Sequence, residues 1–411
     1  MRIPEEIRKS KQLCNRCRHG MKCEEECQRN RHPHRHERYV SSNRSHPYRT
    51  HQSNSYPPRS DRPRVLEASD VVSEEGDDEI ELRKVFNLRA ETWDLTSEDL
   101  ELFRNWCEST EWSISSPSDA HRSAWHAIIR QQVFEYPILL YSTVALSAME
   151  LASGSEVDDH FRIALDHYSR AIIEFSHTLE KSPTGSNAAF VSVGILFGFE
   201  LALLLVGESS ESSICSLNDL NDQTLQDTLP SLLTAFIGVL ETTKGLVGDS
   251  SLIDTVEHSD MGELFTQEDP DLDLPNTSTL TILMLKTINS ASARDNPSHE
   301  KEVYDEVIVQ LGQSLEKLAK VVDPLFIALR FLLRIPRRFL TLLATRQPLA
   351  LAILAHYCAV MHHLRDRWWM GDLGARVLKE ISHVLGPDMV DSIQWATDIV
   401  GVSVDNNSDK S

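Results

Sequence analysis

The sequence predicts an all-α fold, in which a large helical domain follows a short basic Cys/His segment and a disordered linker. Three observations support this prediction. Apolar residues recur every three or four positions over long stretches, alternating strand patterns are almost absent, and a 41% hydrophobic content over 411 residues is enough to bury a sizeable core. No repeat of fixed length is seen, which argues against a solenoid.

The helix boundaries follow from local signals. Thr96 and Asp99 have the spacing of a capping box and predict a helix start. A second helix is predicted over Pro137–Gly154, because proline suits the first helical turn and glycine suits a helix end. Two apolar stripes, Phe161 to Leu179 and Tyr304 to Val322, fit helices of a bundle better than short coiled-coil seams. Further helices are expected at about 228–243, 280–288, 324–335, 348–364 and 375–385.

Other stretches connect these helices. Asp323 followed by Pro324 is a favourable cap and first-turn pair. Residues 207–227 and 248–278 are rich in Ser, Asp and Glu and predict long polar loops.

The apolar run at residues 190–207 is a candidate membrane span. Glu200 lies inside it and would cost about 3 kcal/mol near a bilayer centre. We therefore expect a buried core helix and no membrane span. The charged opening MRIPEEIRKSKQL has no apolar signal region, which favours a reducing compartment, the cytosol or the nucleus.

The charge of the chain is divided unevenly. Residues 1–64, called the basic head below, hold 16 Lys and Arg against 7 Asp and Glu, a net charge of +9, whereas the chain as a whole carries −21. Because nucleic-acid binding comes from neutralising phosphates, the basic head is the part expected to meet nucleic acid or another anion. A solvated tail is the alternative.

The composition divides the chain into four parts. Residues 41–64 are rich in Ser, Pro, Arg and His, residues 67–81 are acidic, and neither stretch has enough apolar surface to offset the entropy of ordering. The predicted parts are a basic Cys/His segment at 1–40, a disordered linker at 41–94, the helical domain at 95–401 and a disordered tail at 402–411.

Four cysteines are crowded into 14 residues with the spacing C-x2-C-x5-C-x3-C: Cys14, Cys17, Cys23 and Cys27. A C-x2-C pair lets two thiolates meet one tetrahedral zinc ion, so this cluster predicts a zinc site. Three bases lie between the cysteines and would favour the thiolate forms: Arg16, Arg18 and Lys22.

The stretch CNRCRHGMKC resembles the first half of the fungal six-cysteine binuclear zinc cluster, whose pattern is C-x2-C-x6-C. The resemblance implies that Arg18 and Lys22 contact bases or phosphates in the major groove, with Arg16 on the same loop. This chain is one residue short in that half and has no second half after Cys27. Three alternatives stay open: a single four-cysteine site, a mixed site that recruits His32, His34 or His36, and a segment that binds no metal.

The helical domain carries a second resemblance. DLELFRNWC, AWHAIIRQQVFEYPILLYSTVALSAMELA and HFRIALDHYSRAIIEF, in this order, are similar to the regulatory domain of sterol-uptake-control-like fungal regulators. So is the closing signature, residues 351–381 with 393–401. Its hallmark positions are Leu354, His356, Tyr357, Trp368, Trp369, Gly371, Arg376, Trp395 and Gly401.

The two resemblances imply a nuclear transcription regulator of sterol or secondary-metabolite genes. Its expected partners are DNA, a second copy or a related regulator, and an apolar small molecule, with zinc as cofactor. The alternative is a regulator without DNA binding that acts as a helical interaction or apolar-ligand module. His356 and Tyr357 on an apolar helix are more typical of core residues than of ligand contacts.

An enzyme is not expected. The sequence contains no phosphate-binding loop, nucleophile elbow or HExxH motif. His362, His363 and Asp366 have no third converging ligand or nucleophile near them in the sequence.

Overall fold

The computed structural model describes residues 75–114, 119–154, 158–181, 185–215, 231–248, 251–259, 261–263, 278–320 and 323–402. The chain divides into two units, Met1–Glu81 and Leu82–Ser411. Within the described ranges every regular element is a helix, which confirms the all-α prediction for this part of the chain. The predicted Cys/His segment and almost all of the predicted tail lie outside these ranges.

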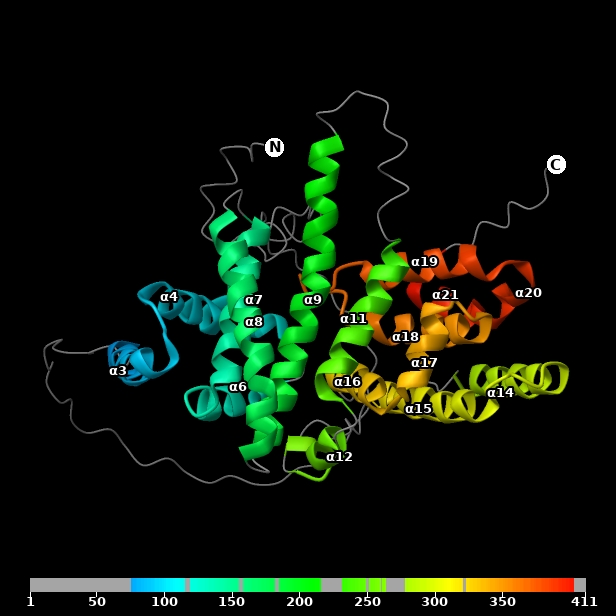
Figure 1. The fold of residues 1–411 in the computed structure, drawn as a ribbon, viewed down its shortest axis with the longest axis horizontal. Helices are drawn as coiled ribbons and strands as arrows, with labels where there is room; N and C mark the ends of the chain where they lie inside the picture. Colours follow the sequence, from blue (N-terminus) through cyan, green and yellow to red (C-terminus); the bar gives the residue numbers. More distant parts are fainter. Residues whose placement is uncertain are drawn as a thin grey trace, which may run out of the picture. The chain divides into compact units, whose positions relative to one another are not determined.

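Figure 1 shows the helices along the chain. The elements of the first half are α3 (Glu75–Trp93), α4 (Ser97–Asn105), the π-helix η2 (Trp106–Thr110), α5 (Glu111–Ile114), α6 (Asp119–Gln132), α7 (Pro137–Gly154), α8 (Asp158–Lys181) and α9 (Gly185–Cys215). Those of the second half are α11 (Leu232–Val247), α12 (Leu252–Glu257), α14 (Ser278–Asp295), α15 (Lys301–Ala319), α16 (Pro324–Arg334), α17 (Arg337–Ala344), α18 (Pro348–His362), α19 (Leu373–Leu385), α20 (Pro387–Val390), η3 (Asp391–Ile393) and α21 (Gln394–Val400).

Two predicted helix starts are confirmed in atomic detail. The Thr96 hydroxyl accepts a hydrogen bond from the Asp99 amide at 3.2 Å, and the Thr96 amide donates to the Asp99 carboxylate at 2.7 Å, which completes the capping box. Asp323 accepts from the Phe326 amide at 2.8 Å and caps α16. Each cap satisfies amide groups that the first turn of a helix leaves without a backbone partner.

Several elements differ from the prediction, three of them in segments predicted as linker or loop. Helix α3 lies inside the segment predicted as linker, and its Phe86 is buried. Helix α9 continues to Cys215, and α12 lies inside a predicted polar loop. The stretches that contain these helices are polar overall, so they lack the apolar periodicity that predicts a helix. In α3 and α12 a few apolar residues pack on the core, and this burial stabilises the helix.

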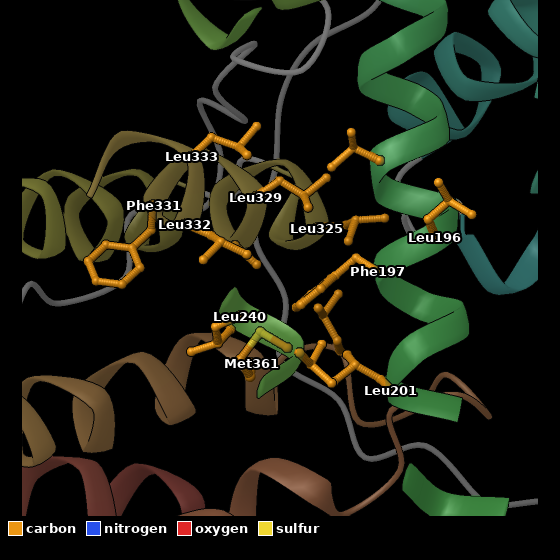
Figure 2. Packing of buried hydrophobic residues seen from close by; sticks show 14 of the residues in the cluster. Leu196, Phe197, Leu201, Leu240, Leu325, Leu329, Phe331, Leu332, Leu333 and Met361 are labelled. Carbon is orange, nitrogen blue, oxygen red and sulfur yellow. The ribbon is translucent and has the colours of Figure 1, made fainter. Parts of the chain in front are cut away.

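Helix α9 is central to the core. It packs against α6, α7, α8, α11, α12 and α16. Figure 2 shows Leu325 and Leu329 of α16 pointing toward α9. A Cβ atom at Gly194 of α9 would lie 3.2 Å from Leu329 Cδ1 and 3.4 Å from the Trp125 ring, so glycine permits the close approach of both side chains.

The apolar run of α9 passes the length and composition test for a membrane span. Among the described residues Ser186–Val206 meets that test, and α17 with α18, bent by 106°, meets it as a pair. Within the Ser186–Val206 run, 72% of the apolar window is buried inside the protein, as in a core helix. One or two such helices are weak evidence for a membrane protein, and the absence of a span stays a prediction.

Candidate functional site

The residues predicted to bind zinc and DNA lie outside the described part of the chain: Cys14, Cys17, Cys23 and Cys27, with Arg16, Arg18 and Lys22. Their roles stay predictions. Across the described residues, no group of three or more His, Cys, Asp or Glu side chains is arranged to hold a metal ion. The candidate site that can be built from contacts is therefore the closing signature.

Helix α18 carries the first hallmark residues into the core. Both His356 and Tyr357 are fully buried. His356 Nε2 lies 2.9 Å from the Ser392 carbonyl, to which it donates, and burial lowers the pKa of His356 to about 4. The Tyr357 hydroxyl donates to the Ala328 carbonyl at 3.1 Å, and its ring stacks on Phe331. These contacts agree with the interpretation of both side chains as core residues.

The turn after α18 carries the tryptophan pair of the signature. Trp369 is fully buried, and its indole nitrogen donates to the Ser113 carbonyl at 3.1 Å. Arg367 donates to the same carbonyl at 2.6 Å, and its guanidinium lies 5.8 Å from the Trp369 ring centroid. A Cβ atom at Gly198 would lie 3.3 Å from the Trp369 ring, so the ring rests directly on the backbone of α9.

These four residues, Ser113, Gly198, Arg367 and Trp369, are called the signature joint below. The joint ties α5 and α9 of the first half to the turn between α18 and α19. Because Arg367 and Trp369 both donate to one backbone oxygen, a shift of α5 would disturb both side chains together. The joint therefore connects the two halves of the helical domain through hydrogen bonds and close packing.

Four further hallmark residues have contacts or backbone conformations that indicate structural roles. Gly371 and Gly401 have φ angles of 47° and 76°, in the left-handed region that favours glycine. Trp395 packs against His356, with ring centroids 5.7 Å apart. Arg376 lies one helical turn from Asp372, at 3.9 Å. The predicted pair His362 and His363 lies at the end of α18.

Buried carboxylates form a second set of contacts, which the sequence did not reveal. Asp99 lies 2.7 Å from His167 Nε2, and both side chains are buried. Glu111 Oε1 lies 2.9 Å from His126 Nδ1, and Oε2 is buried with no hydrogen-bond donor in the described ranges. Burial raises the pKa of Glu111 to about 7, although the charge of Arg130 opposes it.

Glu200, the residue that argued against a membrane span, has a partner on the neighbouring helix. It is 9% exposed and accepts a hydrogen bond from the Tyr168 hydroxyl of α8. The Tyr168 ring stacks on Phe199, with centroids 4.7 Å apart. Burial raises the pKa of Glu200 to about 7, and the hydrogen bond from Tyr168 opposes this rise.

A pH dependence of stability follows from Glu200. Its folded pKa exceeds its ordinary value of 4.5, so the folded state binds more protons than the unfolded state between pH 4.5 and 7, and stability falls as pH rises through that window. We expect the free energy of unfolding of Glu200→Gln, measured relative to that of the parent protein, to rise by about 3 kcal/mol between pH 4.5 and 8. Urea unfolding of both proteins at several pH values measures this difference.

The matched control is Glu241→Gln, which removes an exposed carboxylate from α11. Because this side chain is exposed, its replacement should leave the free energy of unfolding close to that of the parent protein. A Glu200→Gln profile parallel to that of the parent protein would show that Glu200 ionises normally in the fold.

Helix α12 is held to α16 by ion pairs between residues more than seventy positions apart. Arg330 is 6% exposed, and its Nε donates to Glu257 at 2.5 Å. Arg334 donates to Asp254 at 2.6 Å and also to Glu257. The other nitrogens of Arg330 donate to Gln313 at 2.9 Å and Gln310 at 3.4 Å of α15. Charge-assisted bonds therefore join three helices at this point.

Comparison with known proteins adds no identification. No protein-family model matches the chain. No curated protein matches it.

Proposed function

We propose that this chain is a nuclear transcription regulator, in which the basic head contacts promoter DNA and the helical domain controls its activity. The observation that carries the proposal is the charge division: a head of +9 with four clustered cysteines precedes a strongly acidic remainder. DNA attracts the first and repels the second, so the head alone is suited to the duplex.

The cysteine cluster supplies the chemistry of the head. Thiolate sets of this kind bind zinc in structural sites, and Cys14, Cys17, Cys23 and Cys27 would hold one ion. Bound zinc would fold the short segment and fix the loop that carries the bases. Arg18 and Lys22 would then contact phosphates or base edges, with Arg16 beside them.

The helical domain supplies the control. Its two halves meet at the signature joint, where a single carbonyl accepts from Arg367 and Trp369. A partner or ligand that displaced either half would change the orientation of the other. This arrangement suits a domain that responds to a signal, and sterol or secondary-metabolite genes are the targets that the resemblance suggests.

Selection of duplexes from a random pool by the full chain tests DNA binding. We expect sequence-selective binding that weakens with salt and is lost when a chelator removes zinc. Lys22→Ala should weaken binding and, if Lys22 contacts a phosphate, reduce the salt slope by about one. Lys286→Ala, which removes an exposed lysine from α14, is the matched control and should bind as the parent does.

A second candidate function rests on the incomplete cluster, because no second half follows Cys27. In this reading the chain is a regulator without DNA binding, and the helical domain acts as an interaction or apolar-ligand module. Failure of the full chain to select any duplex, with or without zinc, would favour this candidate. Deletion of residues 1–64 should then leave regulation intact, and loss of regulation with a folded domain would exclude it.

A further inference from the structure

A hollow of about 290 Å³ lies where α11, α12 and α15 meet the turn between α16 and α17. Its charged lining consists of Lys244, Arg334, Arg337, Asp254 and Glu306. Apolar side chains such as Ile253 and Ile335 complete the wall. The lining thus contains three cations and two carboxylates, in a chain whose net charge is −21.

One donor in this lining has no acceptor. Arg334 bonds Asp254 and Glu257 through a terminal nitrogen, but its Nε is buried with no hydrogen-bond acceptor within the described ranges. Buried polar groups are nearly always paired, and an exception is commonly explained by a water molecule or an ion. The nitrogen belongs to a guanidinium, whose planar donors match carboxylate and phosphate oxygens.

The other two cations surround the same space from different elements. Lys244 of α11 is 6% exposed, and its ammonium donates to the Leu333 carbonyl at the end of α16. Arg337 begins α17 and is exposed. Lys244 and Arg337 add two cations to Arg334, against the carboxylates of Asp254 and Glu306 in the same lining. A partly dehydrated anion interacts with such cations more strongly than it does in water.

The size and polarity of the hollow limit its ligand. About 290 Å³ is at the lower end of the range for small-molecule sites, and the charged lining does not suit a sterol. We propose that this hollow binds a small organic anion through a carboxylate or phosphate group. This inference does not rest on DNA binding, because all of its residues belong to the helical domain.

The test measures the thermal stability of the full chain with citrate, with inorganic phosphate and with sodium chloride at equal ionic strength. Ligands at about 5 mM act little through exclusion from the surface, so a rise in Tm reports binding. We expect citrate or phosphate, but not chloride, to raise Tm by about 5 °C. The citrate and phosphate arms distinguish the two anion classes.

Three variants locate the binding. Arg337→Gln should weaken the affinity about tenfold, the loss of one charge-assisted hydrogen bond. Glu306→Gln removes a repelling carboxylate from the lining and should tighten binding. Arg338→Gln is the matched control: Arg338 is the next residue of α17, pairs with Glu300 and does not line the hollow, so its affinity should equal that of the parent.

Two results would overturn the proposal. One is the absence of a Tm rise with both citrate and phosphate. The other is an equal response of Arg337→Gln and Arg338→Gln, which is the behaviour expected if anions bind only to the basic head or to the surface at large.

Discussion

Trp369→Ala is expected to lower the free energy of unfolding by about 4 kcal/mol, as removal of a fully buried tryptophan does elsewhere. The ring is 0% exposed and rests on Gly198, and its indole donates to the Ser113 carbonyl. The substitution leaves a cavity between α9 and the turn after α18, because a glycine on the facing helix has no side chain to fill it. Urea unfolding of the full chain measures the loss.

Trp112→Ala is the matched control for this prediction. Trp112 is 52% exposed, precedes Ser113 in α5 and packs edge-on against His126. Its removal should cost less than about 1.5 kcal/mol, the range of one aromatic contact. Equal losses for Trp112→Ala and Trp369→Ala would contradict the stabilising packing of Trp369 on α9.

The second large effect is expected for Arg330→Met, which should lower the free energy of unfolding by about 3 kcal/mol. The substitution keeps the apolar stem but removes the cation, and Glu257, 17% exposed, retains only Arg334. Loss of one partner from a buried ion pair is strongly destabilising, because the remaining charge stays dehydrated. Helix α12 should also exchange its amide hydrogens faster, since Arg330 helps to hold it on α16.

A double-mutant cycle separates this effect from lost packing. The double variant Arg330→Met with Glu257→Met should be less destabilised than the sum of the single variants, because no buried charge is then left unpaired. Arg338→Met, which breaks the exposed pair with Glu300, should cost much less than Arg330→Met. Additive single and double variants would contradict the pairing.

The helices were predictable from the sequence where local chemistry determines them. The capping box of Thr96 and Asp99, the helix over Pro137–Gly154 and the Asp323 cap all depend on residues within a few positions of one another. Such signals survive in any tertiary setting, since the groups that satisfy the helix ends are part of the same short segment.

The short polar helices were not predictable in the same way. Helix α12 has six residues and lies in a stretch rich in Ser, Asp and Glu. The composition of that stretch is typical of a loop. A helix of this length is not stable alone and depends on tertiary contacts. Its ion pairs to Arg330 and Arg334 involve partners that no local pattern connects.

The candidate sites divide along the same line. The sequence by itself determined the charge of the basic head, the cysteine spacing, the all-α class and the positions of the signature residues. Only the tertiary structure decided which buried polar groups pair. These pairs are Tyr168 with Glu200 across 32 residues, Arg330 with Glu257 across 73, and Trp369 with Ser113 across 256. The physical reason is that a buried polar group must find its partner wherever packing brings one, and packing depends on the whole chain.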